Sequence, residues 1–160
     1  MNLIIISGPS GSGKSDLARR ICKDFKNIHI IKTDSYYRDD FIIKILSLYI
    51  KGIYDRIISI KRKELIDTLN SILNKEDLIY QYNYDFKTRK STKKKISIKS
   101  KEYSNQIVIL EGIFAHKLVE NFKNQIFMKI LCNEDQNICY ERRIQRDSTE
   151  RGRKRKEVEE

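Results

Sequence analysis

The sequence predicts an α/β fold in which helices cross over a mostly parallel central sheet. Two observations lead to this expectation. Short apolar runs alternate with segments of helical periodicity along the 160 residues, and a glycine-rich loop joins the first apolar run to the first helical segment. The single proline and six glycines form no linker-like stretch, so we expect one domain over residues 1–160.

The expected strands are short apolar runs, and the expected helices are longer amphipathic segments. The strands are predicted at Leu3–Ser7, Ile28–Lys32, Gln106–Leu110 and Ile126–Cys132. The helices are predicted at Lys14–Phe25, Phe41–Ile50, Lys63–Leu73, Ala115–Phe122 and Glu134–Asp147. Asn133 can cap the last helix, and the acids Glu134 and Asp135 suit its first turn.

The stretch between the second and third expected core strands departs from this alternation. Residues Leu78–Phe86 are rich in aromatic side chains, and Ser97–Lys101 follow after a basic turn. Together they predict a β-hairpin flap over residues 78–101 rather than another crossover. Eight Lys or Arg and no acid occur from Lys87 to Lys101, which fits either a solvated loop or a contact with an anionic substrate.

The charge and cysteine content limit the class of protein. A formal net charge of +11 favours anionic partners, without choosing between nucleotides and nucleic acid. The three cysteines lack paired metal-ligand spacing, which fits reduced thiols. The apolar start is too short for a signal peptide, and no stretch is long enough to cross a bilayer. We therefore expect a cytoplasmic protein without a membrane partner.

Residues 8–15, GPSGSGKS, match the phosphate-binding pattern G-x-x-x-x-G-K-[ST]. Its glycines allow consecutive backbone N–H groups to point at one phosphate group, and the following helix adds its positive N-terminal end. Lys14 is expected to reach the outer phosphates of ATP or GTP, and the Ser15 hydroxyl is expected to bind Mg²⁺. The residues expected to bind nucleotide in this loop are Gly8, Ser10, Gly11, Ser12, Gly13, Lys14 and Ser15.

Two carboxylates follow expected strands at the sheet edge where open α/β sheets bind ligands. Asp34 comes after Ile28–Lys32, where it can accept or orient the proton of an attacking hydroxyl. A turn-forming aspartate is the alternative. Glu111 ends the third core strand, where it can hold Mg²⁺ directly or through water. An exposed acid at a strand end is the alternative there.

Arginines gather in the segment ERRIQRDSTERGR, residues 141–153. Arg143 and Arg146 are three residues apart and share a helix face, while Arg151 and Arg153 flank a glycine beyond the helix. Such a group can close over a triphosphate and neutralise the charge that develops during transfer. We expect a basic lid and tail over residues 147–160, with a merely solvated helix end as the alternative.

In this order, the motifs resemble the uridine kinase family, pyrimidine nucleoside kinases of the phosphate-loop class. The resemblance spans nearly the whole chain and implies a phosphate-loop NTPase three-layer fold. It also implies Mg²⁺-dependent phosphorylation of the 5′-hydroxyl of uridine or cytidine by ATP or GTP, in pyrimidine salvage. Besides the phosphate loop, the matching segments are Asp34–Tyr37, Gly52–Asp55, Tyr84–Thr88, Glu111–Ile113, Arg142–Asp147 and Glu150–Arg153.

The resemblance assigns five residues to the acceptor. Asp34 matches the catalytic aspartate beside the acceptor hydroxyl, and Tyr37 matches a tyrosine of the same site. Asp55 matches the acid that holds the ribose hydroxyls, as a carboxylate accepting two O–H donors would. Tyr84 and Phe86 match the hairpin aromatics that pack against the pyrimidine ring.

The resemblance also implies roles for the cations. Arg143 and Arg153 match substrate-side arginines, whereas Arg146 and Arg151 match arginines on the nucleotide phosphates. Lys14 and Arg146 are expected to assist catalysis together with the aspartate. The family further suggests a homo-oligomer and a small nucleoside as substrate.

Several positions depart from the family pattern. Arg89 stands where the hairpin carries a base-reading histidine, and arginine can donate but not accept a hydrogen bond. Tyr82 replaces a usual proline, and Arg56–Ile58 replace a His-Pro-Asp run. The sequence stops at Glu160, before the closing helix that the family normally carries. The expected acceptor is therefore less closely defined than phosphoryl transfer itself.

Three other interpretations remain open. The chain could phosphorylate another small hydroxylated metabolite, with Arg89 suiting an anionic acceptor. It could be a nucleotide-dependent nucleic-acid-binding protein that uses Lys87–Lys101 and Arg151–Lys156. Asp34 and Asp55 argue against this, because a groove for nucleic acid gains nothing from carboxylates beside its phosphates. We therefore expect no nucleic-acid partner. The chain could also be a catalytically idle relative.

Overall fold

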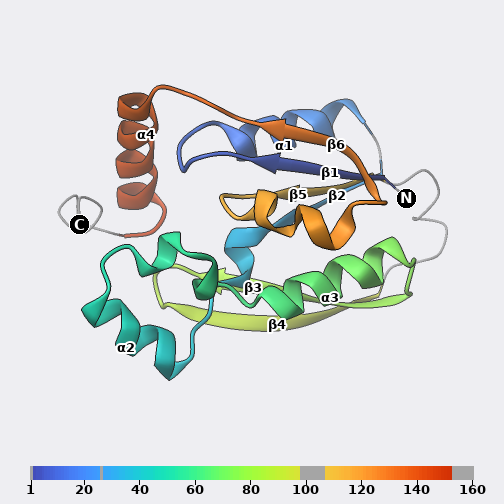
Figure 1. The fold of residues 1–160 in the computed structure, drawn as a ribbon. Helices are drawn as coiled ribbons and strands as arrows, with labels where there is room; N and C mark the ends of the chain where they lie inside the picture. The colour runs from blue at the N-terminus through green and yellow to red at the C-terminus, as the bar shows by residue number, and fades with distance from the viewer. Residues whose placement is uncertain (1, 26, 98–106, 153–160) are drawn as a thin grey trace.

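The computed structural model describes residues 2–25, 27–97 and 107–152, in which a four-stranded parallel sheet forms the centre (Figure 1). The strands are β1 (Asn2–Ser7), β2 (Ile28–Lys32), β5 (Ile107–Glu111) and β6 (Ile126–Leu131), in the order β2-β5-β1-β6. Every pairing between them is parallel. The predicted α/β class with a parallel central sheet is confirmed.

The central strand β1 is apolar because both of its faces are buried. Leu3 and Ile5 belong to one hydrophobic cluster, and Ile4 and Ile6 belong to another on the opposite face. This alternation follows from the two-residue period of a strand. Since all four side chains are at most 7% exposed, β1 lies at the centre of the hydrophobic core.

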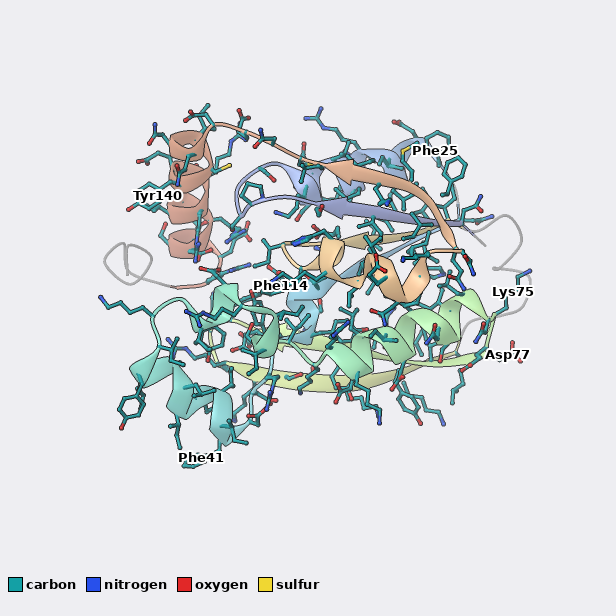
Figure 2. The ribbon with its side chains drawn as sticks, in the orientation of Figure 1. Phe25, Phe41, Lys75, Asp77, Phe114 and Tyr140 are labelled. Carbon is teal, nitrogen blue, oxygen red and sulfur yellow. The ribbon has the colours of Figure 1, made fainter. Side chains whose placement is uncertain are left out.

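Helices cover both faces of the sheet. The helix α1 (Lys14–Asp24) packs Ala18 against the face of Ile4 and Ile6. On the other face lie α3 (Arg62–Leu73) and the 3₁₀ helix η5 (Ala115–Phe122), which with Phe114 contribute to the cluster of Leu3 and Ile5. Figure 2 shows Phe114 between the sheet and this lower layer.

The segments after β2 and β6 bring further elements to the carboxyl edge of the sheet. After β2 come the 3₁₀ helices η1 (Thr33–Tyr36), η2 (Ile53–Asp55) and η3 (Ile57–Ser59), with α2 (Phe41–Tyr49) between the first two. After β6 comes α4 (Gln136–Thr149), which stands beyond the strand ends in Figure 1. None of the helices in the described ranges is long and apolar enough to span a membrane.

The cap of α4 differs from the prediction. The Asp135 carboxylate accepts hydrogen bonds from the backbone N–H groups of Asn137 at 2.9 Å and Ile138 at 3.3 Å, so the helix begins at Gln136 rather than Glu134. Asn133, the predicted cap, lies two residues too early. An ionised carboxylate is a strong acceptor for the free N–H groups of a first turn, which explains why Asp135 takes this place.

The hairpin consists of β3 (Leu78–Asp85) and β4 (Lys90–Ser97), paired antiparallel. The predicted basic turn was placed wrongly, because most of its lysines lie within β4 and the turn is confined to residues 86–89. The Asp85 carboxylate accepts from the N–H groups of Lys87 and Thr88 and thereby closes this turn. Residues 98–101 of the predicted flap lie outside the described part of the chain.

Candidate active site

The phosphate loop lies between β1 and α1, and its glycines Gly8 and Gly11 are in close contact with the rest of the chain. Gly11 has a φ of +86°, and a Cβ added there would lie 2.2 Å from the carbonyl oxygen of Cys139 in α4. Gly13 has a φ of +85° at the start of α1, with nothing within 4 Å of an added Cβ. The loop therefore packs directly against α4 at Gly11, where only glycine fits.

We expect Gly11→Ala to destabilise the fold more than the matched variant Gly13→Ala. Both changes place a Cβ on left-handed backbone, which costs about 1–2 kcal/mol. Only the first also forces the Cys139 carbonyl to move, which should add about 1–3 kcal/mol. The free energy of unfolding from denaturant titration measures the difference, and equal losses would contradict the packing of α4 against the loop.

Lys14 begins α1 and is folded back onto its own loop. Its Nζ donates a hydrogen bond to the Pro9 carbonyl at 2.6 Å, and the residue is only 7% exposed. Burial lowers the pKa of this ammonium, and the nearby carboxylates of Glu111 and Asp34 oppose that shift. The lysine thus lies near two acids while it donates to its own loop.

Ser15 and Glu111 meet at the carboxyl edge of the sheet. The register of β1 and β5 pairs Ile6 with Glu111, which puts the carboxylate opposite the start of the phosphate loop. The Ser15 hydroxyl lies 3.0 and 3.1 Å from the two carboxylate oxygens. Burial raises the pKa of Glu111, and the Ser15 hydrogen bond opposes the shift.

This oxygen pair fits a magnesium ion. Hydroxyl and carboxylate oxygens are ligands that Mg²⁺ prefers, and it commonly uses one or two carboxylates with phosphates and water. The described residues contain no cluster of three or more His, Cys, Asp or Glu that could hold a metal without such help. Ser15 and Glu111 could therefore hold Mg²⁺ together with a bound triphosphate.

Two adjoining hollows open at this edge of the molecule. The outer hollow measures about 580 Å³ and includes Ser15, Lys32 and Glu111 in its lining. The inner hollow has about 30 Å³ of free space and includes Ser10 and Asp55. The residues that line both are Asp34, Tyr84, Phe86, Arg146 and Arg151.

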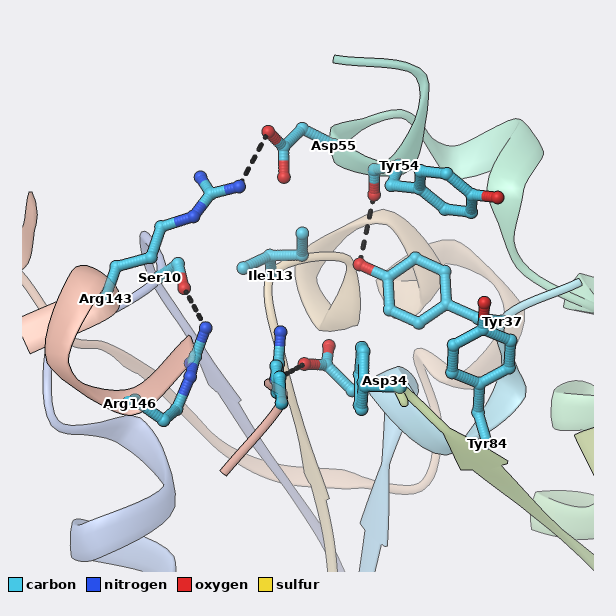
Figure 3. Close-up of a pocket in the computed structure, with 11 residues that line it drawn as sticks. Ser10, Asp34, Tyr37, Tyr54, Asp55, Tyr84, Ile113, Arg143 and Arg146 are labelled. Atoms are coloured by element: carbon cyan, nitrogen blue, oxygen red, sulfur yellow. Dashed lines mark hydrogen bonds and ion pairs between the residues drawn. The ribbon is translucent and has the colours of Figure 1, made fainter. Parts of the chain in front are cut away.

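Aromatic rings form one side of the inner hollow (Figure 3). The ring centroids of Tyr37 and Tyr84 are 5.4 Å apart, and those of Tyr84 and Phe86 are 5.1 Å apart. The Tyr37 hydroxyl donates to the Tyr54 carbonyl at 3.0 Å. Burial raises the pKa of Tyr37, as do the charges of Asp34 and Asp55, so the hydroxyl keeps the proton that it donates.

Arginines from α4 and the residues after it close the other side. Arg143 Nη2 lies 3.5 Å from Asp55 Oδ2, and Arg146 Nη2 donates to Ser10 Oγ at 3.2 Å (Figure 3). Arg151 Nη2 lies 3.3 Å from Asp34 Oδ2. The Arg151 guanidinium also stacks 3.6 Å from the centroid of the Phe86 ring. Because Arg151 occupies this side, the inner hollow has room for only about two water molecules.

The structure brings most of the predicted site residues to the two hollows, with clear exceptions. Five predicted residues of the phosphate loop line neither hollow: Gly8, Gly11, Ser12, Gly13 and Lys14. Arg89 lines neither hollow and is exposed at the hairpin turn, where its φ of +53° is left-handed. Arg153 lies outside the described residues. Arg151, expected on the nucleotide phosphates, contacts Asp34 and Phe86 instead. The predicted residues that line the hollows are Ser10, Ser15, Asp34, Tyr37, Asp55, Tyr84, Phe86, Glu111, Arg143, Arg146 and Arg151.

Among the residues to which sequence reasoning assigned no role, Tyr54 and Lys32 line the hollows and Asp147 contacts an arginine that lines both. Tyr54 accepts the Tyr37 hydrogen bond through its backbone carbonyl, which no side-chain pattern can reveal. Lys32 ends β2 beside Glu111 and lines the outer hollow, a place that the rule on strand ends could have indicated. Asp147 pairs with Arg146, and the sequence could have indicated it as an acid within a run of arginines.

Comparison with known proteins places the chain in a family. A sequence profile of the "Phosphoribulokinase / Uridine kinase family" matches residues 3–160. The chain belongs to this family. Membership confirms the predicted resemblance and makes the protein an ATP-dependent phosphotransferase.

Curated relatives and a solved structure agree with this family. A uridine kinase of Clostridium novyi (strain NT) is 37% identical over 153 residues, covering 94% of this chain and 70% of the relative. A uridine kinase of Haemophilus ducreyi is 33% identical over 159 residues, covering 94% and 69%. A D-glycerate 3-kinase structure from Cryptococcus neoformans var. grubii aligns with a TM-score of 0.64 at 12% identity, covering 99% of this chain and 74% of that one. That structural likeness supports the family's kinase fold.

Proposed function

We propose that this family member transfers the γ-phosphate of ATP or GTP to the 5′-hydroxyl of uridine or cytidine, in pyrimidine salvage. One observation carries the proposal: Asp34 lines both the outer hollow, with Ser15 and Glu111, and the inner hollow, with the aromatic rings and Asp55. A carboxylate at this junction suits a reaction between a triphosphate and a hydroxyl. The uridine kinases among the relatives support the same acceptor.

The outer hollow is the proposed nucleotide side. The N–H groups of the phosphate loop (residues 8–15) would hold the phosphates, with Lys14 turning from the Pro9 carbonyl to the outer ones. Ser15 and Glu111 would hold Mg²⁺, which neutralises phosphate charge when bound. Arg146, already beside Ser10, would stabilise charge that develops on the transferred group.

The inner hollow is the proposed acceptor side. Asp34 would accept the proton of the 5′-hydroxyl as the oxygen attacks, and Tyr37 would border the same group. Asp55 would accept hydrogen bonds from the ribose hydroxyls, with Arg143 beside it. Tyr84 and Phe86, 5.1 Å apart, offer flat apolar surface for a pyrimidine ring.

Binding of an acceptor there requires Arg151 to move. Its guanidinium covers the Phe86 ring and pairs with Asp34, the two groups assigned to the base and the hydroxyl. A bound triphosphate would attract the guanidinium toward its own charge, because phosphate oxygens accept two parallel N–H bonds from arginine. Arg151 would then reach the nucleotide role that the family resemblance implies for it. Arg153 is proposed for the substrate side on that resemblance alone.

A panel of acceptors tests the proposal. ADP or GDP release is measured with Mg²⁺-ATP and Mg²⁺-GTP against uridine, cytidine, purine nucleosides and small hydroxylated metabolites, with an acceptor-free blank for background hydrolysis. We expect turnover with uridine or cytidine well above the blank. Turnover only with another acceptor, or with none, would overturn the proposed substrate.

A second candidate acceptor is a small hydroxylated organic acid. Three guanidinium groups, those of Arg143, Arg146 and Arg151, line an inner hollow of small free volume, which suits a compact anion. The same panel separates this function from the first, provided that it includes glycerate and other hydroxy acids.

We expect Asp55→Asn to weaken binding of the acceptor without weakening binding of ATP. Loss of a charged hydrogen bond of about 1.5–3 kcal/mol corresponds to a rise of roughly 10- to 100-fold in the KM for uridine. The KM for ATP should stay within about twofold, since Asp55 lines only the inner hollow. Asp77→Asn, at the far end of the molecule in Figure 2, is the matched control. An unchanged uridine KM would remove Asp55 from the acceptor site.

A further inference from the structure

Asp147 is a buried carboxylate in the last turns of α4 to which no role has been assigned. It is 0% exposed, and its Oδ1 accepts hydrogen bonds from Arg146 Nε at 2.9 Å and Nη2 at 2.7 Å. Arg151 Nε lies 3.5 Å from the same oxygen. A buried carboxylate is unfavourable unless cations and hydrogen bonds compensate it, and here two guanidinium groups do so.

The two arginines extend from Asp147 to different parts of the site. Arg146 Nη2 donates to Ser10 Oγ of the phosphate loop at 3.2 Å. Arg151 Nη2 pairs with Asp34 at 3.3 Å, and its guanidinium stacks on Phe86. One carboxylate thus links an arginine that contacts the phosphate loop to an arginine that contacts the acceptor side.

The charges explain why two arginines can lie so close together. Burial lowers the pKa of Arg151, the neighbouring charge of Arg146 lowers it further, and the carboxylates of Asp147 and Asp34 oppose both effects. Without a carboxylate between them, two guanidinium groups repel and move toward solvent. The Asp147 side chain therefore compensates the charges of the pair from within the fold.

Other residues also stabilise α4. Asp135 caps its first turn, and Cys139 and Ile144 are buried beneath it. These contacts belong to the earlier turns and involve neither Arg146 nor Arg151. Asp147 is buried on the same helix, and its side chain pairs with both arginines.

We propose that Asp147 is a positioning residue that holds Arg146 toward the phosphate loop and keeps Arg151 beside it at the outer hollow. It lines neither hollow and acts through the two guanidinium groups. The inference rests on the proposed function for its effect on turnover, but its effect on the arginines and on nucleotide binding can be measured separately.

Asp147→Asn tests the proposal, because it keeps the shape and removes the charge. We expect roughly 10- to 100-fold weaker binding of a non-hydrolysable Mg²⁺-ATP analogue in calorimetry, the loss that one charged hydrogen bond of about 1.5–3 kcal/mol produces. The Nε–H signal of Arg146 in NMR spectra should lose its protection from solvent exchange. Asp135→Asn, which keeps the helix cap, is the matched control and should leave both readouts unchanged.

A double-mutant comparison separates positioning from a structural role. In a chain that carries Arg146→Ala and Arg151→Ala, adding Asp147→Asn should cost no further analogue affinity, because its targets are gone. An equal further loss, or wild-type affinity in Asp147→Asn alone, would overturn the proposal. If Asp147→Asn fails to fold, Asp147→Glu keeps the charge, and its displaced carboxylate should still lower affinity through the two arginines.

Failure of this inference can be told apart from failure of the proposed function. Calorimetry and NMR need no acceptor and no turnover. If the wild-type chain phosphorylates no nucleoside, but Asp147→Asn loses affinity only while both arginines are present, the positioning role stands and the acceptor assignment falls.

Discussion

Replacing Asp34 with Asn is expected to lower kcat with uridine by about 100- to 10,000-fold, the range typical of a lost general base. Asparagine fills the same space but cannot take the proton of the attacking hydroxyl. The affinity for Mg²⁺-ATP should change little, because the lost charge acts on the acceptor. Release of Arg151 from its 3.3 Å pair with Asp34 should favour nucleotide binding.

Steady-state kinetics and calorimetry together measure this effect. Asp85→Asn is a matched control from the rim of the outer hollow, since its side-chain oxygen can still accept from the N–H groups of Lys87 and Thr88. A near-normal rate in Asp34→Asn would exclude the aspartate as the base. A similar loss of kcat in both variants would attribute the effect to a disturbed hairpin instead of a lost base.

Replacing Lys14 with Ala is expected to abolish triphosphate-dependent turnover, with kcat lowered by at least about 100- to 1,000-fold. The ammonium is the cation carried by the phosphate loop itself, and it lies between the loop and the carboxylates of Glu111 and Asp34. Burial already penalises its charge, so the variant should be as stable as the wild type without nucleotide.

Two readouts check the Lys14 prediction. Turnover should disappear while the melting temperature without nucleotide stays the same or rises. Lys23→Ala, an exposed lysine in the last turn of the same helix, should change neither. Retained activity would take the loop lysine out of the mechanism.

The strands and the phosphate loop could be read from the sequence because local patterns determine them. Continuous apolar runs indicate strands buried on both faces, and β1 is such a strand. The hairpin was misjudged because charge was taken as a sign of a turn. In β4, Lys93 and Lys95 pair across from Tyr82 and Tyr80, and Lys93 Nζ lies 4.2 Å from the Tyr80 ring, so the lysines remain solvated at a sheet edge.

The site was predictable in its parts but not in its connections. Asp34 was expected at the ligand-binding edge of the sheet, but local patterns do not reveal that β5 lies between β2 and β1. The Asp34 carboxylate lines the hollows from η1, where the chain turns after β2. Arg151 and Asp147 depend on contacts among three side chains, which no spacing rule describes.

The contacts that close the two hollows have a consequence for how the protein folds. Ser10 and Arg146 are 136 residues apart, and Asp34 and Arg151 are 117 apart. Contacts at such separation tend to form late, because the entropy of closing a long loop is lost before the contact contributes. The pairing of β1 with β6 joins residues of similar separation, so the central sheet and the site both need the two ends of the chain to meet. The two hollows are therefore completed by the same long-range closure that completes the sheet.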